Sequence, residues 1–274
     1  MKEQWTAQQK LWIWGKTFLR AMGPLALYVL MPALCLSLGY VALHPEMSAQ
    51  EFFTYGGNFY SALGMILTIL VLYARSKSKK RSFLEDTTLY FDRMDVKKAA
   101  MFLLFGASAA LAVSALLTLL PRWGVAEGYS QASRTMFNGR DMIFTVLTTV
   151  VTAPLAEEII FRGYMLNIFL ETFDERRSIW IVSLIFALCH GQALWILYAL
   201  AMGLLLAWVS VREDNILYGF FLHSGFNLPS VLIWLAGSFE GTNSLFFGSP
   251  WLIAAYGLIG LLLCILLAKR LFGI

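Results

Sequence analysis

Long apolar runs separated by short polar connections dominate the chain. An α-helix needs about 20 predominantly apolar residues to cross a bilayer, and several of the runs come close to or exceed that length. Single crossings are predicted over six ranges: Ala21–Leu43, Phe59–Ala74, Ala99–Leu120, Met142–Phe161, Ile216–Ala236 and Pro250–Ala268. We therefore expect an all-α polytopic membrane bundle, with residues 21–274 forming a single transmembrane domain.

The apolar segment Ser178–Val211 has to supply two further crossings, which makes each of them short. Gly191 and Gln192 form the natural break between the two. Non-helical backbone at membrane depth is tolerated only inside protein or beside water, so His190 at this break is expected to border a wet cavity. With this pair, the bundle has about eight transmembrane helices.

Two flanking segments are amphipathic rather than apolar. Residues 1–20 interleave aromatic and cationic side chains, which favours an interfacial segment on the membrane surface. An ordinary flanking segment with aromatic anchors is the alternative. The run that follows Arg162, up to residue 177, is expected to continue the fourth helix out to the interface.

The composition agrees with a membrane protein. Of the 274 residues, 59% are hydrophobic and 14% are charged, whereas soluble domains carry about 25% charged residues. Three cysteines, all in apolar runs, argue against a disulfide framework.

The distribution of charge predicts the orientation. If the N-terminus is cytoplasmic, 18 of the 21 Lys and Arg residues lie on the cytoplasmic side and three on the other. Cytoplasmic connections carry the excess of Lys and Arg, so we expect a multi-pass cell-membrane protein with both termini in the cytoplasm. Loop placement explains the net charge of +4, so no nucleic-acid partner is needed. The basic connection 75–98 could also bind anionic lipid.

The predicted crossing Met142–Phe161 carries two adjacent carboxylates, Glu157 and Glu158, and Arg162 follows. Ionisable groups at membrane depth are costly and mark candidate functional sites. Glu158 and Arg162 are spaced i,i+4 and share a helix face, where they can neutralise each other. Glu157 is rotated by about 100° and is left free to act as a general base. Pro154 should widen or kink the helix just before this pair.

Two later apolar segments carry the other polar chemistry. His190 ends the sequence FALCH, and His223 and Asn227 belong to HSGFN. His223 and Asn227 lie one turn apart on one helix face, where both could donate to a developing oxyanion. Taken alone, each residue could equally be a packing or interhelical hydrogen-bonding group. Because polar groups inside a bundle must meet partners there, we expect one shared pocket for Glu157, His190, His223 and Asn227.

The order Glu-Glu-x-x-x-Arg, Phe-x-x-x-His and His-x-x-x-Asn resembles the CAAX-protease and bacteriocin-processing (Abi, CPBP) family of intramembrane glutamic endopeptidases. The motif core covers about residues 142–235. The resemblance implies an eight-helix bundle with a polar cavity open to the cytosol. It also implies that Glu157 and His190 activate water, that His223 and Asn227 form an oxyanion hole, and that Glu158 and Arg162 support the site. No metal and no cofactor are implied.

This resemblance predicts a protease that hydrolyses a peptide bond of membrane-associated or lipidated peptides or proteins within the lipid bilayer. The residues leave three alternatives open: a zinc-dependent hydrolase using two histidines and one glutamate, a non-catalytic immunity or binding protein, and a transporter with a proton relay. The sequence does not choose between a prenylated and an unmodified substrate, and the oligomeric state is unknown from it.

Overall fold

The computed structural model describes residues 6–119, 141–191, 193–237 and 249–273, and every regular element in these ranges is helical. Seven of the helices are long and apolar enough to cross a membrane. The chain is therefore an all-α, multi-pass membrane protein, as its hydropathy pattern predicts. The predicted connection between residues 121 and 141 lies almost wholly outside the described residues.

The elements follow one another along the chain as α1 (Ala7–Leu38), η1 (Gly39–Leu43), α2 (Ala49–Ser78), α3 (Phe83–Asp86), α4 (Val96–Leu119), α6 (Met142–Leu147), η2 (Thr148–Thr152), α7 (Ala153–Glu157), η3 (Glu158–Leu166), α8 (Asn167–Leu170), α9 (Glu175–Leu188), α10 (Ala193–Glu213), α11 (Ile216–Gly237) and α13 (Pro250–Phe272). Elements labelled η are π-helical turns, in which hydrogen bonds run from residue i to residue i+5.

The first helix is longer than the predicted crossing. α1 begins at Ala7 behind a capping box formed by Thr6 and Gln9, and it runs through Pro24 and Pro32 without ending. No break separates residues 7–20 from the first crossing, since α1 contains residues 7–20 and most of that crossing. The interfacial position of the N-terminal segment stays a prediction.

The helix that carries the two glutamates is continuous from Met142 to Leu170 but changes its winding. It is π-helical at Thr148–Thr152, α-helical at Ala153–Glu157 and π-helical again at Glu158–Leu166. The widening expected near Pro154 is thus confirmed. The run beyond Arg162 continues the fourth helix as far as Leu170, whereas residues 175–177 already belong to α9. π-helical turns within α-helices are frequent at functional sites.

The segment predicted to hold two short crossings contains one full-length helix and one short one. α9 has 14 residues, fewer than the roughly 20 needed for a full crossing, and it is absent from the seven candidate spans of the described residues. The expected break is present, because Cys189 and His190 form a turn and Gly191 adopts a φ of 72°. Gln192 lies outside the described residues.

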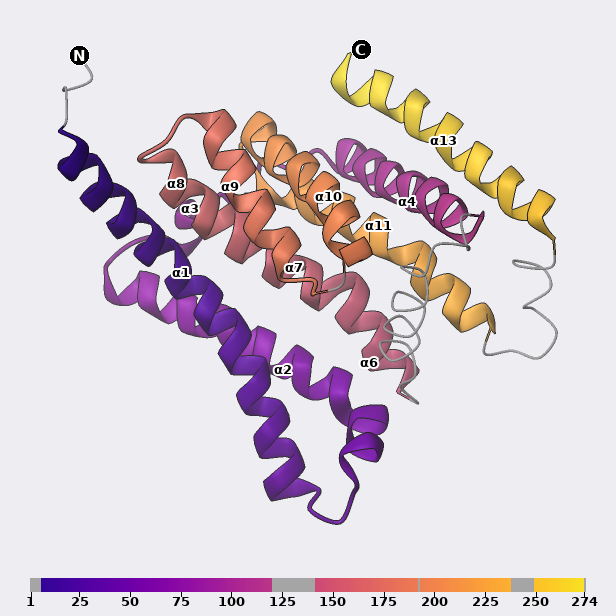
Figure 1. The fold of residues 1–274 in the computed structure, drawn as a ribbon, viewed down its shortest axis with the longest axis horizontal. Helices are drawn as coiled ribbons and strands as arrows, with labels where there is room; N and C mark the ends of the chain where they lie inside the picture. The colour runs from indigo at the N-terminus through magenta and orange to yellow at the C-terminus, as the bar shows by residue number, and fades with distance from the viewer. Residues whose placement is uncertain (1–5, 120–140, 192, 238–248, 274) are drawn as a thin grey trace.

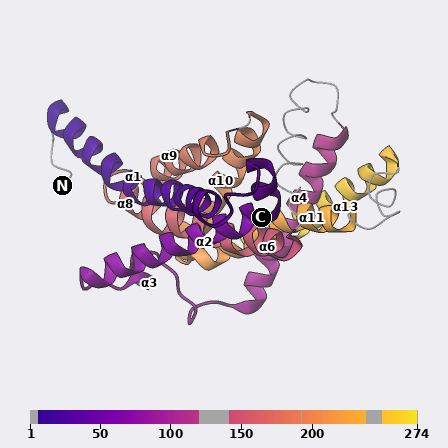
Figure 2. The same cartoon turned by 90° about the horizontal axis from the view of Figure 1, so that it is seen from below.

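The helices form three groups in space. α1 and α2 pair on one side, α4 and α13 pair on the opposite side, and the helices from α7 to α11 lie between them (Figures 1 and 2). The first turn of α1 and the last turn of α13 lie toward the same end of the molecule, and the connection between α1 and α2 lies at the other end (Figure 1). The largest buried core cluster joins α1, the η3–α8 segment, α9 and α10.

Candidate active site

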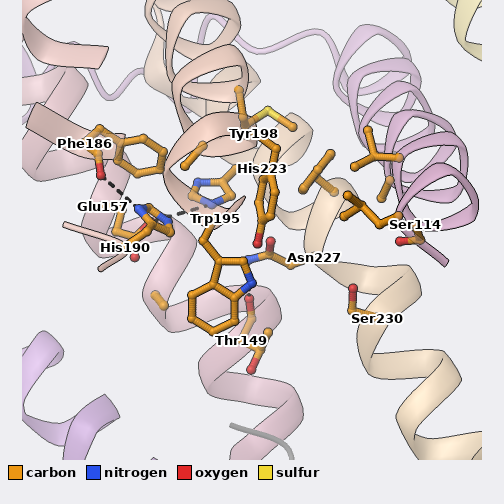
Figure 3. Close-up of a pocket in the computed structure, with 17 residues that line it drawn as sticks. Ser114, Thr149, Glu157, Phe186, His190, Trp195, Tyr198, His223, Asn227 and Ser230 are labelled. Atoms are coloured by element: carbon orange, nitrogen blue, oxygen red, sulfur yellow. Dashed lines mark hydrogen bonds and ion pairs between the residues drawn. The ribbon is translucent and has the colours of Figure 1, made fainter. Parts of the chain in front are cut away.

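A cavity of about 240 Å³ lies between the middle group of helices and α4, and the four predicted catalytic residues all line it (Figure 3). Glu157 comes from the end of α7, His190 from the turn after α9, and His223 and Asn227 from α11. The rest of the wall is largely apolar and aromatic, including Trp195, Tyr198 and Phe226. The shared pocket that the sequence predicted is therefore present.

Glu158 and Arg162 form the ion pair that their spacing predicts, in the interior of the protein. The Arg162 Nη1 atom donates to Glu158 Oε1 at 3.0 Å, and both side chains are fully buried. Arg162 also donates from Nη2 to the Gly203 carbonyl oxygen at 3.2 Å, and its guanidinium lies 4.4 Å from the ring centre of Phe186. The pair thereby ties the diglutamate helix to both α9 and α10.

His223 stands between the two glutamates. Its Nδ1 atom lies 3.1 Å from Glu158 Oε1, and its Nε2 atom lies 3.6 Å from Glu157 Oε2. An imidazole carries one donor when neutral and two when protonated, so the contact with Glu158 orients the ring and directs Nε2 toward Glu157. The sequence predicted a common pocket for His223 and Glu157, but it did not predict that His223 also contacts Glu158.

Glu157 has a second partner that sequence reasoning missed. The hydroxyl of Tyr28, on α1, donates to Glu157 Oε1 at 2.8 Å. The Tyr28 ring packs edge-on against Phe161 at 6.4 Å. Because the Glu157 side chain is only 18% exposed, its two oxygens face defined neighbours rather than lipid or bulk water. Nothing in the sequence distinguishes Tyr28 from other tyrosines in apolar runs.

His190 is held by its own motif. Its Nδ1 atom lies 2.9 Å from the Phe186 carbonyl oxygen, which is one helical turn earlier, and the two rings pack at 4.8 Å. A carbonyl only accepts hydrogen bonds, so Nδ1 must carry the hydrogen. In the neutral ring, Nε2 is then the acceptor nitrogen. The FALCH sequence therefore positions an imidazole with an acceptor lone pair at the cavity wall.

Asn227 is anchored across the cavity to the widened part of the diglutamate helix. Its Nδ2 atom donates to the backbone carbonyl oxygen of Thr149 at 2.9 Å, and Thr149 belongs to the π-helical turn η2. A primary amide has two donor hydrogens, so this bond leaves one available. Asn227 and His223 both line the cavity from one face of α11, as their spacing predicts.

The zinc alternative needs three protein ligands around one point. Among the residues that the structure describes, no group of three or more His, Cys, Asp or Glu side chains is arranged to hold a metal ion. His223 is turned with one ring nitrogen toward each glutamate. The arrangement of side chains fits hydrogen bonding and proton transfer within the cavity.

Comparison with known proteins agrees with the motifs. Residues 139–229 match the family model described as type II CAAX prenyl endopeptidase Rce1-like. This match contains the four predicted catalytic residues and the Glu158–Arg162 pair. It confirms the resemblance to CAAX proteases for this part of the chain. Tyr28 lies outside the matched segment.

An uncharacterised 24.3 kDa protein of Escherichia coli is 34% identical over 90 residues, which make up 30% of this chain and 41% of the relative. The chain thus covers about two fifths of the length of the curated relative that it matches. No solved structure matches the chain.

Proposed function

Starting from an Rce1-like segment at residues 139–229, we propose that this protein is a membrane endopeptidase that hydrolyses peptide bonds of membrane-associated or lipidated substrates with a water molecule activated by Glu157 and His190. The observation that carries the proposal is the convergence of Glu157, His190, His223 and Asn227 on one cavity within a membrane-spanning bundle. The four residues come from three sequence motifs, which lie at the end of α7, in the turn after α9 and in α11.

Glu157 and His190 supply the nucleophile in this proposal. Water bound in the cavity gives one proton to the Glu157 carboxylate while the acceptor nitrogen of His190 orients its other hydrogen. The resulting hydroxide forms a bond to the peptide carbonyl carbon, and the carbonyl electron pair moves onto oxygen. Proton transfer to a positioned side chain contributes roughly 10²- to 10⁴-fold to rate.

His223 and Asn227 stabilise the negative charge that develops on the carbonyl oxygen. Asn227 has one donor hydrogen left after its bond to Thr149, and His223 donates from Nε2 when that nitrogen carries a hydrogen. Donors of this kind are each worth about 2.7–4 kcal/mol in hydrolases. When the intermediate collapses, the carbon–nitrogen bond breaks and the proton on Glu157 passes to the leaving amine.

Glu158 and Arg162 act as supports in this scheme. Their buried pair holds the Nδ1 side of His223 through Glu158 Oε1. They have no direct part in bond making or breaking. Removing either side chain is therefore expected to reduce the amount of folded protein more than the turnover of each folded molecule.

The proposal is tested with purified protein in detergent and a fluorescence-quenched peptide that ends in a farnesylated CAAX sequence, alongside the same peptide without the farnesyl group. Glu157→Gln and His190→Ala should each lower the cleavage rate by at least about 10²-fold. Mass spectra of membrane peptides from cells with the wild type and with Glu157→Gln identify natural substrates.

Matched controls use the same substitutions away from the cavity. Glu175→Gln changes an exposed glutamate in the first turn of α9, and His44→Ala changes a histidine that contacts Tyr60. Both should cleave at the wild-type rate. Wild-type cleavage by Glu157→Gln and His190→Ala would support a binding protein instead. Loss of activity with a chelator and its return with zinc would support the zinc hydrolase, and solute uptake into vesicles without cleavage would support a transporter.

We further propose that both termini face the cytoplasm. The Lys and Arg distribution supports this orientation, and so does the position of the first turn of α1 and the last turn of α13 toward one end of the bundle (Figure 1). A phosphatase or fluorescent-protein fusion at the C-terminus reports the side. Phosphatase activity outside the cell membrane would overturn the orientation.

A further inference from the structure

The first helix contributes a side chain to the cavity's carboxylate although it lies more than 100 residues before the diglutamate motif. Tyr28 donates to Glu157 Oε1 at 2.8 Å, across a sequence separation of 129 residues. The other carboxylate oxygen, Oε2, lies 3.6 Å from His223 Nε2. The two oxygens of Glu157 therefore have different surroundings, one facing a phenol and the other facing the imidazole.

The position of Tyr28 is secured by contacts on both sides of it along α1. Two turns earlier, Arg20 forms a two-armed ion pair with Glu171 at 2.7 and 3.1 Å, and the Thr17 hydroxyl lies 2.8 Å from that of Thr172. One turn later, Pro32 lies so close to Gly64 that a Cβ on Gly64 would come within 2.3 Å of the Pro32 Cα. The helix is thus held against both the end of α8 and the middle of α2.

The bond has a chemical consequence beyond packing. A carboxylate that is free to rotate about its terminal torsion can turn either oxygen toward a substrate. A hydrogen bond to one oxygen fixes the plane of the carboxylate. A hydrogen bond donated to a carboxylate also favours the ionised form, which is the form that accepts a proton. Tyr28 thereby occupies Oε1 and leaves Oε2, on the His223 side, without that bond.

We propose that Tyr28 is a positioning residue for the general base: its hydroxyl holds Glu157 Oε1 so that Oε2 takes the proton from water. This inference rests on the proposed peptidase function. It assigns part of the site to α1, outside the segment that matches the Rce1-like family model.

Tyr28→Phe tests the inference because it removes the hydroxyl and keeps the ring that packs on Phe161. With the farnesylated peptide, the expected result is a kcat lowered by about 10- to 100-fold with KM nearly unchanged. The acid limb of the kcat profile should move to higher pH, since the ionised carboxylate loses a donor. Other titratable groups around Glu157 are Glu158 and Arg162 on its own helix, His223 on α11, and Cys189 and His190 in the turn after α9. All of these are unchanged in the variant.

Tyr60→Phe is the matched control. Tyr60 is a buried tyrosine on α2 whose hydroxyl contacts His44 at 3.2 Å. Its loss should leave kcat and the pH profile at wild-type values, and melting temperatures of both variants in detergent report any general loss of stability.

The outcomes separate the two proposals. Equal kcat and equal acid limbs for Tyr28→Phe and Tyr60→Phe, with an active wild type and an inactive Glu157→Gln, would overturn the role of Tyr28 alone. A lowered kcat that comes with a matching fall in melting temperature and an unmoved acid limb would also overturn it, because that pattern reports folding. Equal cleavage by wild type and Glu157→Gln would overturn the peptidase function itself.

Discussion

α11 and α13 both pack against α4, but α11 is enclosed by other helices whereas most of α13 is exposed on the outside of the protein. α13 is the most apolar of the seven candidate spans, and only 6% of its most apolar window is buried inside the protein. α11 has the lowest mean hydropathy of the seven, and 56% of its window is buried. In water the more apolar segment would be the one inside. In a bilayer, lipid tails are as apolar as leucine, so the polar helix occupies the centre.

The two helices also differ in how tightly neighbours enclose them. α11 contacts α4, α10 and three parts of the diglutamate helix, whereas α13 packs mainly along α4. Both use glycine for close approach, at Gly225 against the Leu103 carbonyl oxygen and at Gly260 against the Ser108 carbonyl oxygen. We therefore expect substitutions to lower the stability of the protein most in helices that bury polar groups among many neighbours. The hydropathy of a helix is a poorer guide to this loss.

Breaking the buried ion pair behind α11 should have the largest effect. Arg162→Ala leaves the Glu158 carboxylate buried without its cation, and such a loss costs about 3–5 kcal/mol. Unfolding of the purified protein in mixed micelles measures the change. Arg177→Ala is the control, since its pair with Asp174 is largely exposed and is worth about 0–1 kcal/mol. An Arg162→Ala protein as stable as the control would contradict the central role of the pair.

Adding a methyl group at the α4 contacts sharpens the comparison between the two helices. A Cβ at Gly225 would lie 2.0 Å from the Leu103 carbonyl oxygen, and a Cβ at Gly257 on α13 would lie 2.5 Å from the Ala115 Cβ. Gly225→Ala should cost about 3 kcal/mol, because α11 is enclosed and cannot move away, and Gly257→Ala about 1 kcal/mol, because α13 can shift toward lipid. The same unfolding titration compares them. Equal losses would show that α13 is held as firmly as α11.

Truncating a leucine should also destabilise the protein more on α11 than on α13, but the loss of stability should be smaller than for the glycine substitutions. Leu222 on α11 is completely buried, and Leu262 on α13 is 53% exposed. Leu222→Ala should destabilise the protein by about 2 kcal/mol through a packing defect, and Leu262→Ala by less than about 0.5 kcal/mol. Thermal unfolding in one detergent detects the difference. A larger loss at Leu262 than at Leu222 would mean that α13 is covered by another protein surface rather than by lipid.

The smallest effect is expected at the edge of the molecule. Arg20 and Glu171 are about half exposed, and exposed ion pairs contribute about 0–1 kcal/mol. Arg20→Gln should therefore lower stability only slightly, with the difference disappearing at high salt. A loss that is large and insensitive to salt would show that this pair, rather than the aromatic contacts of Trp14 and Phe18 with Phe169 and Phe173, holds α1 in place.

The hydropathy pattern predicted the helical membrane class and most helices, because each long apolar run has one stable solution in a bilayer. In the segment 178–211 it predicted two short helices, and the structure has the 14-residue α9, which ends at the turn that carries His190, followed by α10. Helix ends were underestimated, since α2 continues from Ala49 to Ser78 with polar residues at both ends.

The site was predicted as a set of residues but not as a set of contacts. Spacing alone placed Glu158 beside Arg162 and His223 on the same face as Asn227. It could not place His223 against both glutamates, because that contact depends on how α11 packs against the diglutamate helix. Tyr28 was missed for the same reason: a hydrogen bond between helices 129 residues apart leaves no local pattern.

The π-helical turns on either side of Glu157 make this helix sensitive to its number of residues. A π-turn holds one residue more than an α-turn, so a chain one residue shorter between Thr148 and Thr152 could close into regular α-helix. Every later side chain would then swing by about 100° around the axis relative to the earlier part of the helix. A change of length here would therefore rotate the second half of the helix against the first. A one-residue deletion would turn Glu157 and Glu158 away from the His223 ring that lies between them.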